Sequence, residues 1–313
     1  MFGGKILIMK LTAQLLKHSA TTLVGLGLVT APAHAAVLVS PTNDATTLSN
    51  NILGSGINIS KVTYSGAASA SGTFSGGSSA GIGINTGIIM TTGDANTAGN
   101  GTNDSPGDAD LSNLISGATT NDAASLSIDF TTQGGDLFFN YVFASEEYNE
   151  YVNSQYNDVF GFFLDGKNIA LLPGTTTPVA INTVNGGNPI GTSATNPSLY
   201  NNNNPANFDT GYDGFTKVLT AQALNLTPGT HSIKLAIADT GDTLLDSAVF
   251  IQGNSFADTP VAPTPGGAVP ATEVPFDFSP GLGILIIGVW GAIAQLKSKV
   301  QKWKSCVSAF SKN

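Results

Sequence analysis

Carboxylates are the side chains best placed for chemistry in this sequence, because they gather where predicted strands begin and end. Glu146 and Glu147 follow one predicted strand, and Asp158 opens the next. Asp242 and Asp246 lie at the entrance of a third strand. Loop carboxylates with few lysines nearby suit a hard cation such as calcium, which takes about six to eight oxygen ligands. The pattern predicts a calcium site with Glu147, Asp158 and Asp246 as its first ligands and with Glu146 and Asp242 as secondary ones.

Two other interpretations of the same acids stay open. In the first, they cap turns and keep the surface soluble without binding a metal, and no EF-hand spacing is present to favour calcium directly. In the second, Glu147 works with Asp158 or Asp246 as the paired carboxylates of an extracellular carbohydrate-cleaving enzyme. Carboxylates that converge on one point would favour calcium, whereas an open cleft with two carboxylates about 5–10 Å apart would favour the enzyme.

Other kinds of catalytic site lack the residues that they need. His231 is the only histidine after residue 35, and Cys306 is the only cysteine in the sequence. A zinc site made of several histidines, or a cysteine nucleophile in the body of the protein, is therefore excluded. We expect a protein without enzymatic activity, with the carbohydrate-cleaving enzyme as the alternative.

The net charge of −9 is distributed unevenly along the sequence. Residues 36–270 carry nineteen acidic residues and four lysines, which gives −15, whereas residues 1–35 and 271–313 carry +3 each. All twelve basic residues are lysine. Nucleic-acid recognition relies on basic patches and on arginine, so this acidic body predicts no nucleic-acid partner.

The basic N-terminal end has the three parts of a secretory signal peptide. Lys5, Lys10 and Lys17 precede an apolar run over residues 21–29, and Ala33-His34-Ala35 forms a cleavage site. We expect residues 1–35 to be removed and the remaining protein to be exported, with an extracellular or cell-surface location.

The C-terminal end predicts a linker followed by a membrane anchor. Residues 259–274 are rich in proline, and residues 275–313 contain a Pro-Phe-acid motif, an uncharged apolar run at 281–296 and a basic tail. The run predicts a transmembrane helix that leaves the C-terminus inside the cell, or, as the alternative, an amphipathic helix at the membrane interface. This order resembles a PEP-CTERM-type sorting signal, although the motif departs from its Pro-Glu-Pro core. The resemblance implies an exosortase-like processing enzyme as a partner and leaves open whether the tail is cleaved or retained.

Short strands separated by turns account for most of the body. Strands are predicted over residues 57–64, 87–92, 126–130, 137–143, 160–164 and 233–237, and residues 248–251 predict a strand buried on both faces. Asp165-Gly166 predicts a type I′ hairpin turn. Residues 44–53 predict one short helix with Thr46 or Thr47 near its cap. We therefore expect residues 36–258 to form a single all-β domain, an antiparallel β-sandwich of jelly-roll-like type.

Three long motifs of this body lie at residues 143–151 (FASEEYNEY), 157–166 (NDVFGFFLDG) and 237–251 (IADTGDTLLDSAVFI). They resemble the choice-of-anchor L domain of bacterial secreted proteins. The likeness covers nearly all of residues 45–256. It implies one exported domain that is combined with different surface anchors, which agrees with the predicted tail, and it implies no particular activity.

These observations predict a surface-anchored, non-enzymatic module of adhesion or of the extracellular matrix, stabilised by calcium. Its expected partner is a polysaccharide or a neighbouring surface protein. Five tyrosines are candidates for stacking on sugars, and ordinary packing at the base of loops is the alternative for them. They are Tyr148, Tyr151, Tyr156, Tyr200 and Tyr212.

Overall fold

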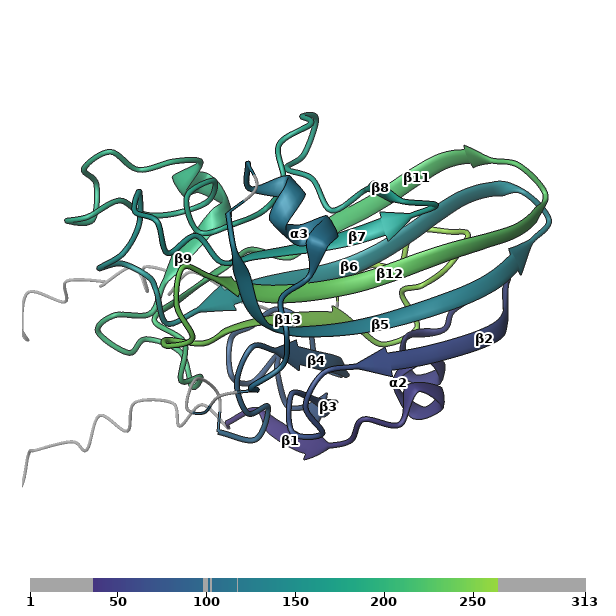
Figure 1. The fold of residues 1–313 in the computed structure, drawn as a ribbon, viewed down its shortest axis with the longest axis horizontal. Helices are drawn as coiled ribbons and strands as arrows, with labels where there is room; N and C mark the ends of the chain where they lie inside the picture. Colours follow the sequence, from purple (N-terminus) through teal and green to yellow (C-terminus); the bar gives the residue numbers. More distant parts are fainter. Residues whose placement is uncertain (1–35, 98–100, 102, 117, 264–313) are drawn as a thin grey trace, which may run out of the picture. The chain divides into compact units, whose positions relative to one another are not determined.

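The computed structural model describes residues 36–263 except 98–100, 102 and 117 (Figure 1). The predicted signal peptide, the sorting motif at 275–280 and the apolar run at 281–296 lie outside the described residues. Within the part that is described, no helix is long and apolar enough to cross a membrane.

Two antiparallel sheets make up the domain, which confirms the predicted all-β fold. The first sheet has eight strands, in the order β1 (Leu38–Pro41), β3 (Ser71–Ser75), β4 (Gly87–Thr91), β13 (Ser247–Gln252), β6 (Gly135–Ser145), β10 (Gly214–Thr216) and β9 (Tyr200–Asn202), with β11 (Leu219–Leu226) also paired to β6. The second has five strands, in the order β2 (Ile57–Ser65), β5 (Thr120–Thr132), β12 (Gly229–Thr240), β7 (Val159–Leu164) and β8 (Lys167–Asn168). The jelly-roll-like connectivity stays a prediction.

Aromatic side chains join the inner faces of the two sheets. Tyr141 of β6 contacts Phe160 and Phe162 of β7, with ring centroids 4.9 and 5.2 Å apart. All three rings are fully buried. Alternation in each strand sends every second side chain to this interface, so that the predicted period-2 segments supply the core.

The outer face of the eight-stranded sheet is also covered, by loops rather than by a second sheet. Val142 and Ala144 of β6 pack there with Phe74 and Phe250. Strand β13 is therefore buried along its whole length, which confirms the prediction of a strand buried on both faces.

The local predictions for the helix and the hairpin are largely confirmed. Helix α2 spans Ala45–Ile52, but Asp44 rather than a threonine is the N-cap, because its carboxylate accepts hydrogen bonds from the N–H groups of Thr46 and Thr47. Asp165 and Gly166 have φ values of 47° and 80° between β7 and β8, as a type I′ turn requires. The returning strand β8 is short and ends at Asn168.

The first residues of the predicted linker lie against the domain. The side-chain amide of Asn140 donates a hydrogen bond to the carbonyl of Val261 at 2.6 Å, and that of Gln252 donates one to Ala262 at 3.0 Å. Both amides belong to the eight-stranded sheet and are buried. A free linker can therefore begin only after residue 262.

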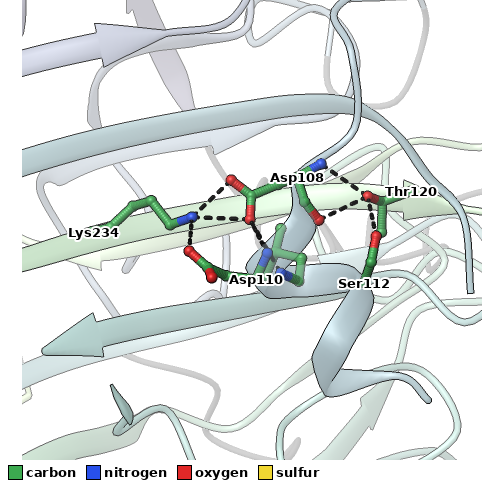
Figure 2. A network of polar contacts seen from close by, with 6 residues as sticks. Asp108, Asp110, Ser112, Thr120 and Lys234 are labelled. Carbon is green, nitrogen blue, oxygen red and sulfur yellow. Dashed lines mark hydrogen bonds and ion pairs between the residues drawn. The ribbon is translucent and has the colours of Figure 1, made fainter. Parts of the chain in front are cut away.

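A polar network holds the short helix α3 (Ala109–Leu114) on the outer face of the five-stranded sheet (Figure 2). Lys234 of β12 contacts both carboxylate oxygens of Asp108, at 2.9 and 2.8 Å, and also contacts Asp110. Asp108 is the N-cap of the helix, and its backbone N–H donates to Thr120 Oγ1 of β5 at 2.9 Å. The ammonium group also lies 5.0 Å from the centre of the Phe163 ring. The helix is thus fixed by charge and hydrogen bonds as well as by Leu111, its buried apolar residue.

His231 forms a second link, between β12 and the β7–β8 turn. Its Nδ1 atom lies 2.7 Å from Asp165 Oδ2, and its Nε2 atom lies 2.9 Å from the carbonyl oxygen of Thr227. Because both partners are hydrogen-bond acceptors, they favour the doubly protonated ring. The hydrogen bonds to Asp165 and Thr227 raise the pKa of His231.

Replacing the lysine of the α3 network should destabilise the domain. Lys234→Met keeps the aliphatic stem over Phe163 but leaves Asp108, which is 15% exposed, without its cation. We expect a loss of about 1–2 kcal/mol in urea unfolding. Asp110→Asn serves as the control, since Asp110 is 54% exposed and its pair should contribute less than about 1 kcal/mol. Equal losses in the two variants would contradict the assigned roles.

His231 should make the stability of the domain depend on pH. Its pKa is higher in the folded state than in the unfolded chain, so the stabilisation is complete below about pH 6.5 and is lost as the pH rises through the folded pKa. We expect the stability advantage of the wild type over His231→Phe, which keeps a ring beside Phe130, to shrink from pH 6 to pH 8 in thermal unfolding. Asp165→Asn should remove this trend, and a trend that persists in it would argue against the pair.

Candidate metal centre

The five acids singled out in the sequence come together at one end of the sandwich, where β6 ends and where β7 and β13 begin. Glu146 and Glu147 follow β6 directly, and Asp158 immediately precedes β7. Asp242 and Asp246 belong to the loop between β12 and β13. The five acids thus lie at the same end of the sandwich, and their role as metal ligands stays a prediction.

Antiparallel register produces the juxtaposition. Ser145, the last residue of β6, pairs with Ser247, the first residue of β13. One step beyond this pair, the backbone N–H of Glu146 donates to the carbonyl of Asp246 at 3.1 Å. The N–H of Glu147 donates to Ser145 Oγ at 2.9 Å. The first bond holds Glu146 at the entrance of β13, and the second holds Glu147 against the end of β6.

Asp158 differs from the other acids because both of its oxygens have partners. Oδ1 accepts from the backbone N–H of Thr240 at 2.9 Å, and Oδ2 accepts from Ser247 Oγ at 2.7 Å. The side chain is completely buried, and burial raises its pKa, although these two hydrogen bonds act in the opposite direction. Asp158 therefore connects β12 of one sheet to β13 of the other.

Three neighbouring carboxylates are buried without such partners. Asp239 and Asp246 are each 1% exposed, and their carboxylate oxygens lack well-formed hydrogen bonds, although Asp239 lies beside Asp158 and Thr92, whose side chains act on its pKa. Glu147 is 2% exposed, and its Oε2 atom is also without a partner. A buried carboxylate is strongly unfavourable unless a cation, hydrogen bonds or a bound proton compensates its charge. These groups are therefore compensated either by a bound proton or by a cation.

Burial and repulsion between neighbouring carboxylates raise the pKa values of the acids in the cluster. Burial first, and then the charges of Asp158 and Asp242, raise the pKa of Glu147 to about 9. Burial, followed by the charges of Asp122 and Asp94, raises the pKa of Asp246 to about 7.

Two further acids of the end cluster show the same pattern. Burial and then the charge of Asp246 raise the pKa of Glu146 to about 7. The pKa of Asp239 is raised as well, by burial and by the charge of Asp158. No lysine or histidine is present among the residues that line the site to reverse these shifts.

Asp239 and Asp122 were not selected as ligands from the sequence. Asp239 continues the alternation of Ile233, Leu235 and Ile237, so the period-2 pattern already indicated an inward-facing carboxylate. For Asp122, no sequence pattern indicated an inward-facing carboxylate. It lies at an irregularity of β5, opposite the interval between Ile237 and Asp239, and has a positive φ of 50°. Its carboxylate is buried, with one oxygen unpartnered.

The cluster opens into a hollow of about 860 Å³. Glu146, Glu147, Asp242 and Asp246 line it together with apolar side chains of the same loops. Within the described residues, however, no group of three or more acidic, histidine or cysteine side chains is already arranged around one point as a metal ion would need. By the criterion of convergence on one point, this arrangement does not favour a calcium site formed by the carboxylates alone.

The five tyrosines divide into two groups. Tyr148, Tyr200 and Tyr212 are buried, so the expectation that they stack on sugars is wrong for them, and packing is their role. Tyr148 and Tyr200 contact each other with ring centroids 4.9 Å apart. Only Tyr151 and Tyr156 line the hollow, in an edge-to-face pair with centroids 5.3 Å apart.

Comparison with known proteins supports the resemblance seen in the motifs. The family model described as the choice-of-anchor L domain matches residues 38–257. No curated protein and no solved structure matches the sequence. The match implies a cell-surface or extracellular protein and covers both sheets and the acidic end. The chain belongs to the choice-of-anchor L domain family.

Proposed function

We propose that this protein is an exported, surface-anchored and non-enzymatic module of adhesion or of the extracellular matrix, whose acidic end is stabilised by calcium. The supporting observation is the group of buried carboxylates that lack hydrogen-bond partners, namely those of Glu147, Asp239 and Asp246. An ion that binds among them would neutralise charges that burial otherwise destabilises.

The donor set favours calcium over other common ions. Only oxygen donors are available, which argues against zinc, and the carboxylates come from several loops rather than from a rigid octahedral arrangement, which argues against magnesium. Calcium accepts irregular coordination, and backbone and water oxygens can complete its coordination sphere. Asp158 would hold β12 and β13 in position for this site through its own two hydrogen bonds.

One observation favours a carbohydrate-cleaving enzyme instead. The raised pKa of Glu147, about 9, would keep this carboxyl protonated as a general acid beside an open hollow. Such an enzyme also needs a second, ionised carboxylate that faces the substrate. We favour the calcium-bound module because Asp239 and Asp246 are both deeply buried and unpartnered, which a two-carboxylate mechanism does not require.

Calcium should raise the melting temperature of residues 36–263. At a free concentration about a hundred times its dissociation constant, it would stabilise the fold by about 2.7 kcal/mol, which corresponds to roughly 5–10 °C for a domain of this size. EDTA should reverse the shift, and re-addition of calcium should restore it in scanning calorimetry. An unchanged melting temperature throughout this cycle would refute the proposal.

The variant Asp246→Asn should change the melting temperature in opposite directions without and with calcium. Without calcium, the neutral amide should leave the melting temperature unchanged or raise it, because an uncompensated buried charge is removed. With calcium, the variant should lose most of the stabilisation. Asp129→Asn is the matched control, since it removes the same charge from a position in β5 that is not part of the cluster. A calcium response that is equal in wild type and Asp246→Asn would exclude Asp246 as a ligand.

The proposed anchor is tested by deleting residues 275–313. We expect this truncation to release the protein into the medium, because it removes the apolar run and the basic tail together. Fractionation of cells should find the full-length protein with the membrane or the surface. Mass spectrometry of that protein should show whether an exosortase-like enzyme has removed the tail. A truncated protein that stays bound to membranes would contradict an anchor in this segment.

A further inference from the structure

Strand β11 is an edge of the eight-stranded sheet that lacks the usual protection against pairing with another strand. In the part of the chain that the structure describes, the edge strands β1, β8 and β9 are only two to four residues long. The longer edge strand β2 contains Lys61 beside a shift of register, and a charge or a bulge on an edge opposes further pairing. By contrast, β11 has eight residues, of which none is charged and none is proline. Such an edge is a template for a further strand.

The register of β11 shows which of its backbone groups face the free edge. Gln222 lies opposite Phe138 of β6. The N–H and C=O groups of Phe138 are both bonded to Ala257 instead. Opposite residues of an antiparallel pair exchange either both backbone bonds or none, so Gln222 and Phe138 exchange none. The N–H and C=O groups of Gln222 therefore point to the free edge, and by alternation so do those of Thr220.

A hollow of about 630 Å³ leaves room beside this edge. It is lined by β11 as far as Gln222 and by residues 171–175, which follow β8 in the chain. Strand β11 itself pairs only with β6. The side chains of Thr220 and Gln222 are exposed, and that of Leu224 is 53% exposed. The free edge is therefore accessible to a strand of another molecule.

We propose that β11 pairs in antiparallel orientation with β11 of a second copy of this chain, so that two eight-stranded sheets join across a two-fold axis. The charges beside the strand select this orientation. Lys217 precedes β11 and is exposed, whereas Asp136 lies at the far end, where its Oδ1 atom accepts a hydrogen bond from the N–H of Asn225 at 3.0 Å. Antiparallel pairing brings Lys217 of each copy near Asp136 of the other, whereas parallel pairing would bring like charges together.

Self-association meets less repulsion at β11 than elsewhere on this acidic body. Residues 36–270 carry a net charge of −15, whereas β11 carries none. With Gln222 on the two-fold axis, its N–H and C=O groups exchange hydrogen bonds with those of Gln222 in the second copy, and Leu224 lies opposite Thr220. Each contact then occurs twice, as in other two-fold interfaces. This pairing involves none of the acids at the end of the sandwich, so it stands or falls independently of calcium.

Sedimentation velocity of residues 36–274, which retain both sheets, measures this association over about 1–500 µM. We expect an equilibrium between monomer and dimer. Gln222→Lys should weaken the dimer at least about tenfold, because two like charges would meet at the axis. Gln155→Lys is the matched control, since it adds the same charge at an exposed position between β6 and β7 and should not weaken the dimer. A protein that stays monomeric throughout, or a dimer that Gln222→Lys leaves unchanged, would overturn the inference.

Charge reversal and cross-linking test the orientation. Lys217→Asp should weaken the dimer, and Asp136→Lys in the same chain should restore it, because opposite charges again lie side by side. Cys306 is the only cysteine and lies outside residues 36–274, so Gln222→Cys introduces a single thiol. Opposite Cα atoms of an antiparallel pair are about 5.5 Å apart, which suits a disulfide. After oxidation, Gln222→Cys should migrate as a covalent dimer in non-reducing electrophoresis, and Gln155→Cys as a monomer. Absence of this cross-link would refute the pairing, even if a charge variant failed to fold.

Discussion

The carboxylate of Asp158 is the group on which the acidic end of this protein depends. It is completely buried between the sheets and accepts one hydrogen bond from the backbone of Thr240 and one from the hydroxyl of Ser247. Thr240 ends β12 in the five-stranded sheet, and Ser247 begins β13 in the eight-stranded sheet. Hydrogen bonds are stronger away from water than at an exposed surface. One side chain thus sets the separation of the strand ends from which Asp239 and Asp246 project.

The surroundings of Asp158 differ from the rest of the domain in how charged side chains are paired. In the sheets, apolar side chains face the core, and Lys234 and His231 each have acidic partners. At the acidic end, buried carboxylates face one another, and each raises the pKa of its neighbours. Local violations of this kind are expected where a protein binds something, because stability is given up there for function.

Much of the fold could be predicted from the sequence, because the alternation of apolar and polar residues can be recognised within each strand separately. The strongly periodic segments became β5, β6, β7 and β12, and the Asp165-Gly166 turn formed as expected. Strands β9 and β10 were missed because three residues are too few to show a period, and β11 because its inward side chains include small alanines. The asparagine-rich segment over residues 185–208 did not predict a folded loop. Its buried Asn185 and Asn203 satisfy neighbouring backbone groups through their side chains.

The sequence by itself determined the all-β class, the acidic character of the body and the five carboxylates that end up at one rim. Each of these follows from residue types and short spacings along the chain. Only the tertiary structure decided which carboxylates are buried without partners, that Asp158 is already hydrogen-bonded, and that Tyr148, Tyr200 and Tyr212 belong to the interior. These properties depend on strand register and on loops that fold back from distant positions, such as the pairing of Ser145 with Ser247. Alternation along one strand indicates which face a side chain lies on, but it does not identify the distant strand end that will lie beside it.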